Sequence, residues 1–314
     1  MTEAADKTPE VLFVDDEKRI LKSMKALFRS GFQVHLADNG AEALDIVRDN
    51  EIDVIVSDQR MPQMTGIEVL RSVKERSPAT MRILLTGYSD LSAIIQSINE
   101  GEVYRFINKP WANDELRATV ADAAQIAQRS RDLPDNTEDG VIGAAQSAGV
   151  LVIDDDPEVR KEIENSIGVS FQVHFAETME ETVAALEKDE IGVIISETNL
   201  RSGDMTDLLL LVKRYNRNLV NLVMSEHSDP SLVIRLINQG QVHRFLPKPV
   251  DRDSYWAVVN AAMKRYQAIQ ESLKRDDGTL ADRYQPSAPG KEVEDSVPAG
   301  ITNRLRSLRA SLGA

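Results

Sequence analysis

The sequence predicts an α/β protein with two tandem doubly wound parallel-sheet domains and a C-terminal tail. Short apolar runs alternate with segments of helical apolar spacing over the first 131 residues. This order is typical of βαβ units joined by right-handed crossovers. The same alternation then recurs at one constant offset along the chain. A strand–helix pattern that occurs twice indicates the duplication of one domain.

The strands of the first copy are expected where short runs of Val, Ile or Leu end at acidic, Gly or Pro residues, as buried parallel strands do. These runs are 11–14, 32–37, 54–57, 82–86 and 103–107. Apolar residues at helical spacing predict helices over 20–28, 41–47, 67–73, 91–98 and 113–131.

The second copy repeats the motifs of the first without a gap. The matched pairs are Asp15-Asp16 with Asp154-Asp155, Phe32-Gln33-Val34-His35 with Phe171-Gln172-Val173-His174, Gly101 with Gly240, and Lys109-Pro110 with Lys248-Pro249. One offset that fits so many pairs makes chance agreement negligible. We therefore expect both copies to share one fold.

Composition shifts predict the domain boundaries. Residues 1–8 are expected to be disordered, 9–131 to form the first domain, 132–148 to be a linker rich in Pro, Gly and Ala, and 149–275 to form the second domain. Residues 276–314 are expected to be a flexible tail. Its part 276–300 carries Pro, Gly and charge without an apolar period, which predicts disorder. Its end, 301–312, predicts a short basic amphipathic helix.

The charge and the composition exclude several classes of protein. The net charge of −14 argues against non-specific nucleic-acid binding. The absence of Cys excludes disulfides and thiolate sites. No apolar run approaches the roughly 18 residues of a membrane span, and the polar N-terminus lacks a signal peptide's apolar region. We expect a cytoplasmic protein that neither enters membranes nor binds nucleic acid.

Chemically active side chains follow the predicted strands at their carboxyl ends, where open α/β sheets bind ligands. In the first copy these residues are Asp15, Asp16, Asp58, Thr86 and Lys109. Three carboxylates in one crevice repel one another, and Mg²⁺ is a hard cation that suits them. A carboxylate beside Mg²⁺ can act as nucleophile toward a phosphoryl group, whose charge the lysine and the threonine would stabilise. The set is coherent as a phosphoryl acceptor.

These motifs together resemble the receiver domain of bacterial two-component response regulators, with the flavodoxin-like (βα)5 fold of the chemotaxis regulator. The marks are the pair Asp15-Asp16, the D-x-x-M-P-x-M-x-G run of 58–66, Thr86 in Leu-Leu-Thr-Gly, and Lys109-Pro110. The resemblance implies that Asp58 accepts phosphate from a sensor histidine kinase. It also implies that Asp15, Asp16, Asp58 and the backbone carbonyl of Arg60 bind Mg²⁺, and that Thr86 and Phe106 act as switch residues. The sequence around the motifs of the first copy is also similar to that of receivers found ahead of HD-GYP phosphodiesterase domains.

The second copy departs from this pattern at the acceptor position. Glu197 stands where the acceptor aspartate is expected, the Met-Pro and Gly marks are lost, and Ser225 replaces the threonine. Asp154, Asp155 and Lys248 remain. We interpret this copy as a pseudo-receiver that does not accept phosphate. Glutamate is longer by one methylene group and can also imitate a phosphorylated aspartate in charge. The sequence does not decide whether this copy binds Mg²⁺.

The expected function is that of a response regulator that acts through protein–protein contacts, with a downstream effector or a homodimer mate as partner. Its chemistry would be limited to its own phosphorylation and dephosphorylation, so it is not expected to be an enzyme. Three alternatives are weaker. A dehalogenase-type phosphatase would need a D-x-D nucleophile and a cap insertion, a DNA-binding regulator would have to rely on one short helix, and an inert scaffold would leave the complete first site unexplained.

Overall fold

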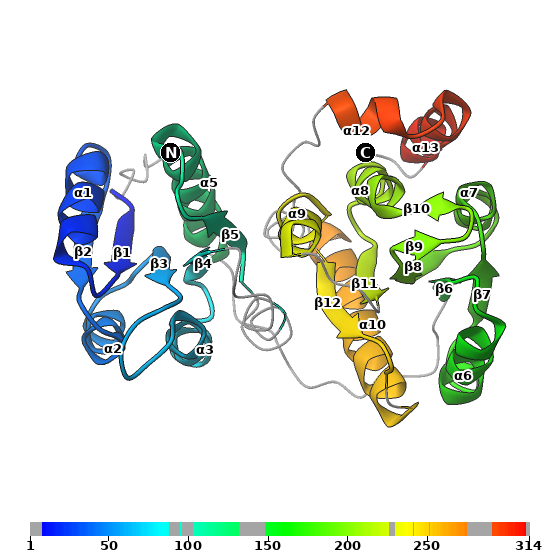
Figure 1. The fold of residues 1–314 in the computed structure, drawn as a ribbon, viewed down its shortest axis with the longest axis horizontal. Helices are drawn as coiled ribbons and strands as arrows, with labels where there is room; N and C mark the ends of the chain where they lie inside the picture. The colour runs from blue at the N-terminus through cyan, green and yellow to red at the C-terminus, as the bar shows by residue number, and fades with distance from the viewer. Residues whose placement is uncertain are drawn as a thin grey trace. The chain divides into compact units, whose positions relative to one another are not determined.

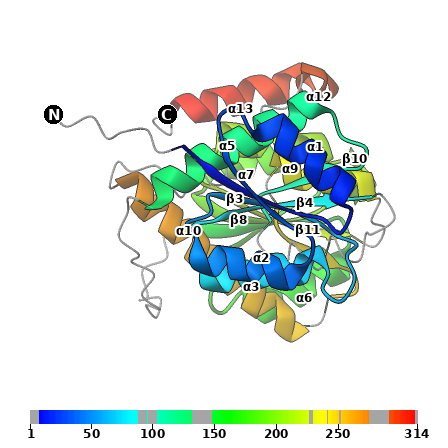
Figure 2. The same ribbon diagram turned by 90° about the vertical axis from the view of Figure 1, so that its left-hand side faces the viewer.

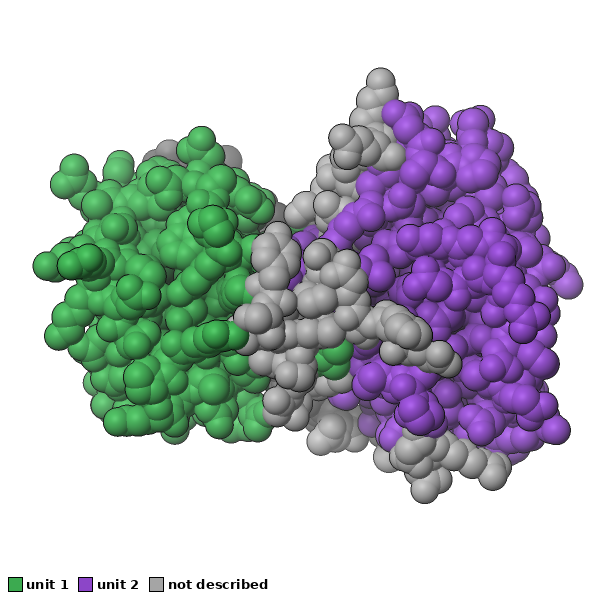
Figure 3. Space-filling model, viewed as in Figure 1, with its two compact units in different colours: residues 1–136 green, residues 137–314 purple. Residues whose placement is uncertain are grey.

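The computed structural model describes residues 8–87, 95, 103–131, 148–225, 230–240, 242–250, 252–274 and 291–311. The chain divides into two compact units, residues 1–136 and 137–314, shown in Figure 3. The division lies inside the segment predicted to be a linker. Each unit is described below by itself.

Unit 1 contains a five-stranded parallel sheet of order β2-β1-β3-β4-β5. Its strands are β1 (Glu10–Val14), β2 (Gln33–Ala37), β3 (Val54–Asp58), β4 (Met81–Thr86) and β5 (Arg105–Asn108). Its helices are α1 (Lys18–Phe28), α2 (Gly40–Asp49), α3 (Gly66–Arg76) and α5 (Asn113–Arg131). The predicted doubly wound fold is confirmed. The helix predicted over 91–98 lies outside the described residues except for Ile95, which is helical.

Helices cover both faces of this sheet, with α1 and α5 on one side and α2 and α3 on the other, as Figure 2 shows. This double cover explains why β1, β3 and β4 are buried throughout instead of alternating. On the α1–α5 side, the rings of Phe13 and Phe28 lie 4.9 Å apart. Polar residues fix where helices begin, since Asn39 caps α2 and Thr65 forms a capping box with Glu68 at α3.

Unit 2 repeats the topology, with sheet order β12-β11-β8-β6-β7 and parallel pairing throughout (Figure 1). Its strands are β6 (Gly149–Ile153), β7 (Val173–Ala176), β8 (Ile191–Glu197), β11 (Val220–Ser225) and β12 (Val242–Pro247). Its helices are α6 (Pro157–Ile167), α7 (Met179–Lys188), α8 (Thr206–Tyr215), α9 (Pro230–Gly240) and α10 (Arg252–Lys274). The duplication predicted from the sequence is therefore also a duplication of the fold.

Two features distinguish unit 2. The loop after β8 forms a short antiparallel hairpin, β9 (Asn199–Leu200) with β10 (Gly203–Asp204), where the first copy carries the Met-Pro turn. The C-terminal segment folds into α12 (Lys291–Ser296) and α13 (Ala299–Ser311), which pack on α7 and α8. The helix predicted near the end of the chain is present and begins two residues earlier than expected.

The disorder predicted for 276–300 is wrong from Lys291 onward, because Val293 and Val297 are buried against unit 2. Residues 276–290 lie outside the described part of the chain. None of the described helices combines the length and the apolar character needed to cross a membrane.

Candidate functional site

The predicted site residues of unit 1 meet at the carboxyl edge of its sheet. Asp15 follows the last residue of β1, Asp58 ends β3, Thr86 ends β4, and Lys109 follows β5. Because the strands are parallel, these four ends lie at the same edge. The alternation of strands and helices therefore places residues that lie far apart in the sequence around one point.

Three carboxylates and one ammonium group form the centre of this site. Oxygens of Asp15, Asp16 and Asp58 all lie within 4.8 Å of one another. The Nζ of Lys109 lies 2.8 Å from Oδ1 of Asp58 and 3.3 Å from Oδ2 of Asp15. Asp15 and Asp58 are only 2% and 6% exposed, whereas Asp16 is exposed to solvent.

The electrostatics of this cluster favour an additional cation. Burial raises the pKa of Asp15 above its ordinary value, and the Glu17 N–H and the charge of Lys109 oppose this shift without cancelling it. Burial alone would lower the pKa of Lys109, but the hydrogen bonds and the charges of Asp58 and Asp15 together outweigh it, so this pKa lies above its ordinary value. One ammonium group cannot neutralise three carboxylates. Hard oxygen ligands at this spacing fit Mg²⁺.

The turn after β3 explains why the motif contains Gly66. A Cβ atom at this position would lie 2.2 Å from the backbone oxygen of Asp58, closer than any real contact. The N–H of Gly66 donates to the Gln59 oxygen at 3.1 Å, so the first turn of α3 lies directly against the end of β3. This close approach fixes the backbone that carries the Asp58 carboxylate.

The remaining predicted residues of unit 1 lie near the site with different exposure. The Thr86 side chain is buried and its hydroxyl donates to the oxygen of Gly87 at 3.2 Å. Phe106, on β5, is 2% exposed, so its ring already lies inside the unit. Arg60 lies two residues beyond β3 with its side chain exposed.

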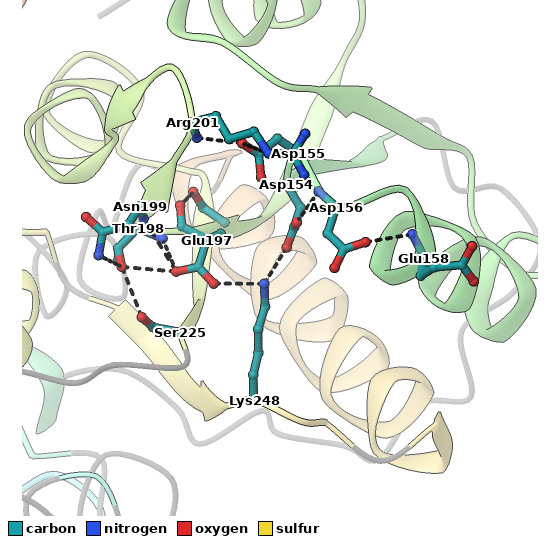
Figure 4. A network of polar contacts seen from close by, with 11 residues as sticks. Asp154, Asp155, Asp156, Glu158, Glu197, Thr198, Asn199, Arg201, Ser225 and Lys248 are labelled. Carbon is teal, nitrogen blue, oxygen red and sulfur yellow. Dashed lines mark hydrogen bonds and ion pairs between the residues drawn. The ribbon is translucent and has the colours of Figure 1, made fainter.

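In the corresponding site of unit 2, donors of the protein itself contact each of the three acids (Figure 4). The Nζ of Lys248 lies 2.8 Å from both Asp154 Oδ2 and Glu197 Oε2. Burial alone would lower the pKa of Lys248, but the hydrogen bonds to these two acids outweigh it and raise this pKa. Both acids are buried.

The second oxygen of the Glu197 carboxylate is also engaged. Oε1 accepts hydrogen bonds from the N–H of Thr198 at 2.8 Å, from its hydroxyl at 3.2 Å, and from the N–H of Asn199 at 3.4 Å. The Thr198 hydroxyl also lies 3.2 Å from that of Ser225. The carboxylate of Glu197 thus lies between a lysine, two backbone N–H groups and hydroxyl groups, which are donors suited to a phosphoryl group.

The hairpin after β8 provides a hydrogen-bond donor for Asp155, the third acid of this site. Oδ2 of Asp155 accepts a hydrogen bond from the backbone N–H of Arg201 at 2.5 Å, and the Arg201 Nε lies 3.9 Å away. Within the described ranges, the metal-ligand spacing is met by the acids of unit 1, and Asp154, Asp155 and Glu197 do not meet it. The sequence did not predict the roles of Thr198, Asn199 and Arg201. The loss of the Met-Pro and Gly marks was the available signal that this loop takes another path.

Comparisons with known proteins identify the same two regions. The family model described as "Response regulator receiver domain" matches residues 11–121 and 150–260. The hydrogenase transcriptional regulatory protein HoxA of Cupriavidus necator is 39% identical over 121 residues, 38% of this chain and 25% of that protein. The regulatory protein AtoC of Escherichia coli is 32% identical over 124 residues, 39% of this chain and 27% of that protein.

Among solved structures, the signal receiver domain of an HD domain-containing protein from Pseudomonas fluorescens Pf-5 is 34% identical. The match covers 42% of this chain and 98% of that one, with a TM-score of 0.41. The chain therefore spans about a quarter of the length of the curated relatives and nearly the whole of the single receiver.

Proposed function

Because this chain belongs to the response regulator receiver family and carries a receiver in each unit, we propose that unit 1 is the phosphoacceptor and that unit 2 is a regulatory pseudo-receiver. The observation that carries the proposal is the asymmetry of the two sites. In unit 1 one lysine faces three clustered acids, whereas in unit 2 protein donors engage every acid. The chain acts as a response regulator in a two-component system, with a sensor histidine kinase as phosphodonor, in the cytoplasm.

In the proposed reaction, an oxygen of Asp58 attacks the phosphorus atom of a phosphohistidine. The new O–P bond forms as the N–P bond breaks, and the departing imidazole takes up a proton. Mg²⁺ bound by Asp15, Asp16, Asp58 and the Arg60 carbonyl would neutralise charge on the phosphoryl oxygens. Lys109 moves its ammonium group from Asp58 to a phosphoryl oxygen, and the Thr86 hydroxyl turns from Gly87 to donate to another. Hydrolysis of the acyl phosphate returns Asp58 to the free carboxylate and releases inorganic phosphate.

The output of this reaction is a change of protein–protein contacts. Phosphorylation shifts a two-state equilibrium toward the state in which Thr86 and Phe106 are drawn inward, and so alters the surface around β5 and α5. A downstream effector or a homodimer mate would bind that surface. The pseudo-receiver presents its own surface without phosphate, because Glu197 already engages Lys248.

Two alternatives receive less support. The relatives HoxA and AtoC are regulatory proteins, which would suit a DNA-binding role. However, two arginines of helix α13 that such a role would use contact acids of this chain, Arg304 on Glu187 and Arg306 on Glu294. An inert scaffold would have no need for three acids at metal-ligand spacing.

Intact mass spectrometry with Mg²⁺ and acetyl phosphate tests the proposal. We expect one added phosphoryl group on the native chain, none on Asp58→Asn, and none when Mg²⁺ is removed by a chelator. Glu197→Gln serves as the matched control for a carboxylate change at the other site and is expected to keep the single adduct. No adduct on the native chain with acetyl phosphate or with histidine kinases, or an adduct that survives Asp58→Asn, would contradict the assignment.

A further inference from the structure

Helix α8 of unit 2 is buried on its outward face, unlike its counterpart α3 in unit 1. Leu210 and Leu211 of α8 are both 0% exposed. The repeat places Arg71 and Ser72 of α3 at the same positions, and both are partly exposed. Apolar side chains on the outward face of a helix are buried only where another element covers them. Some other element therefore covers the outward face of α8.

The covering element is the C-terminal segment, residues 291–311. Besides α9, which also packs on α8, helix α12 packs on α8, and α13 packs on both α8 and α7, as Figure 1 also shows. The buried apolar residues of this segment recur at a four-residue spacing: Val293, Val297, Ile301 and Leu305. Val293 lies on α12, Val297 lies in the break between the helices, and Ile301 and Leu305 lie on α13. The two helices thus present one apolar stripe to a hydrophobic groove, as amphipathic helices do. This pairing adds an interface outside the family match, which ends at residue 260.

Charged contacts at the edge of this interface fix the register of the segment. Arg304 binds Glu187 of α7 through two nitrogens. Glu294 binds Arg214 of α8 and Arg306 of α13. These side chains are between about a fifth and a half exposed, and pairs at such exposure contribute little net stability. The apolar stripe therefore supplies most of the attraction, and the ion pairs orient it.

The two units together show that the cover is separable from the receiver fold. Unit 1 builds the same sheet and helices with Arg71 and Ser72 on α3. In unit 2 the sheet and the helices through α10 complete the same topology before residue 275. The C-terminal segment is thus an addition to a complete receiver, docked on a face that sequence divergence has made apolar.

We propose that the α7–α8 face of unit 2 is a helix-binding surface and that residues 291–311 are its tethered occupant. The segment can yield this surface to a partner helix of the same chemistry. That helix carries apolar residues at four-residue spacing, a glutamate after the first of them and an arginine before the last.

Sixteen residues, 275–290, connect the segment to α10. A connection of this length gives an effective concentration on the order of millimolar, so a segment that binds with a Kd of about 10 μM is released about 1% of the time.

Placing the residues of α3 on α8 tests whether the C-terminal segment can leave unit 2 without unfolding it. The full-length double variant Leu210→Arg with Leu211→Ser gives α8 the residues of α3. We expect hydrogen exchange of the 291–311 backbone to accelerate at least tenfold, while α8 and the sheet of unit 2 keep their protection. The matched double variant Leu210→Met with Leu211→Met, which keeps the face apolar, should leave exchange of the segment within a factor of two of native.

A second experiment tests binding in trans without changing α8. A fluorescent peptide of residues 289–314 is titrated into the full-length native chain and into Ile301→Asp, in which the tethered segment is disfavoured. We expect the peptide to bind Ile301→Asp at least tenfold more tightly than the native chain, and a peptide that itself carries Ile301→Asp not to bind.

Loss of cooperative unfolding of unit 2 in both the Leu210/Leu211 arginine–serine variant and Ile301→Asp would overturn the proposal and make the segment an integral part of the core. Equal affinity of the peptide for both chains, or no binding, would also overturn it.

Discussion

Lys109 and Lys248 stand at equivalent positions of the two units but have different surroundings. Lys109 faces acids at metal-ligand spacing, whereas Lys248 and backbone N–H groups bind the acids of unit 2. The difference comes from one extra methylene at the acceptor position together with a rerouted loop. At the residue scale, the proposed loss of phosphoacceptor chemistry in unit 2 would thus be accompanied by donors of the protein itself around the Glu197 carboxylate.

Gly66 offers a direct test of how the acceptor backbone is held. In Gly66→Ala the new Cβ would meet the backbone oxygen of Asp58 at 2.2 Å, so the chain must shift. We expect unit 1 to lose about 2 kcal/mol of stability and to accept phosphate more slowly. Urea unfolding followed by Trp111 fluorescence in a Trp256→Phe background measures this. Gly300→Ala, where an added Cβ meets nothing within 4 Å, is the control, and unchanged stability in Gly66→Ala would show that the turn is not tight.

Lys213 predicts a pH dependence of unit 2. Burial lowers the pKa of this fully buried amine to about 7, from its ordinary 10.5. Between these values the unfolded chain binds more protons than the folded chain, so stability rises with pH. We expect the free energy of unfolding to rise by about 1 kcal/mol from pH 7 to pH 8 through this group.

Lys213→Met should remove this rise, and Lys74→Met at the equivalent position of unit 1 should leave it in place. Urea unfolding followed by Trp256 fluorescence in a Trp111→Phe background measures unit 2 alone. A rise that persists in Lys213→Met would mean that another group causes it.

At the scale of single elements, the β9–β10 hairpin determines the state of Asp155. The backbone N–H of Arg201, not its guanidinium alone, binds this carboxylate. Glu197→Asp by itself is therefore expected to leave unit 2 without metal affinity. Adding Arg201→Pro removes the N–H donor at a turn position where proline is common, and should give unit 2 measurable Mg²⁺ binding by calorimetry in an Asp16→Asn background that weakens the unit 1 site.

Arg201→Ala is the matched control for this experiment, since it removes the guanidinium and keeps the N–H. It should not add Mg²⁺ binding to the Glu197→Asp chain. If the alanine and proline variants gain the same affinity, the side chain and not the backbone holds Asp155.

Most of the first site could be predicted because parallel strands bring their carboxyl ends together. The spacing of Asp15, Asp58 and Lys109 on such strands is enough to place them side by side. The path of the loop that carries Arg201 could not be predicted, because it depends on tertiary hydrogen bonds that leave no periodic pattern. Docking of 291–311 was not predicted, because Pro298 and Gly300 interrupt the helical pattern between α12 and α13. The unbroken run Leu208–Leu211 was the available signal that the outward face of α8 is covered.

At the scale of the whole molecule, the chain combines a receiver whose three acids lie at metal-ligand spacing with one whose acids are bound by donors of the protein itself. Each unit carries one of the two tryptophans, Trp111 in unit 1 and Trp256 in unit 2. The thermal unfolding of either unit can therefore be followed separately in the full-length chain, using Trp256→Phe or Trp111→Phe.

The measurement that tests the account most directly is the unfolding temperature of each unit with and without Mg²⁺. A ligand at ten times its Kd stabilises the native state by about 1.4 kcal/mol, so unit 1 should unfold about 5 °C higher with Mg²⁺. Asp16→Asn should abolish this shift, and unit 2 should unfold at the same temperature in both conditions. A shift of unit 2 equal to that of unit 1, or no shift of unit 1 at saturating Mg²⁺, would contradict the division of roles between the two sites.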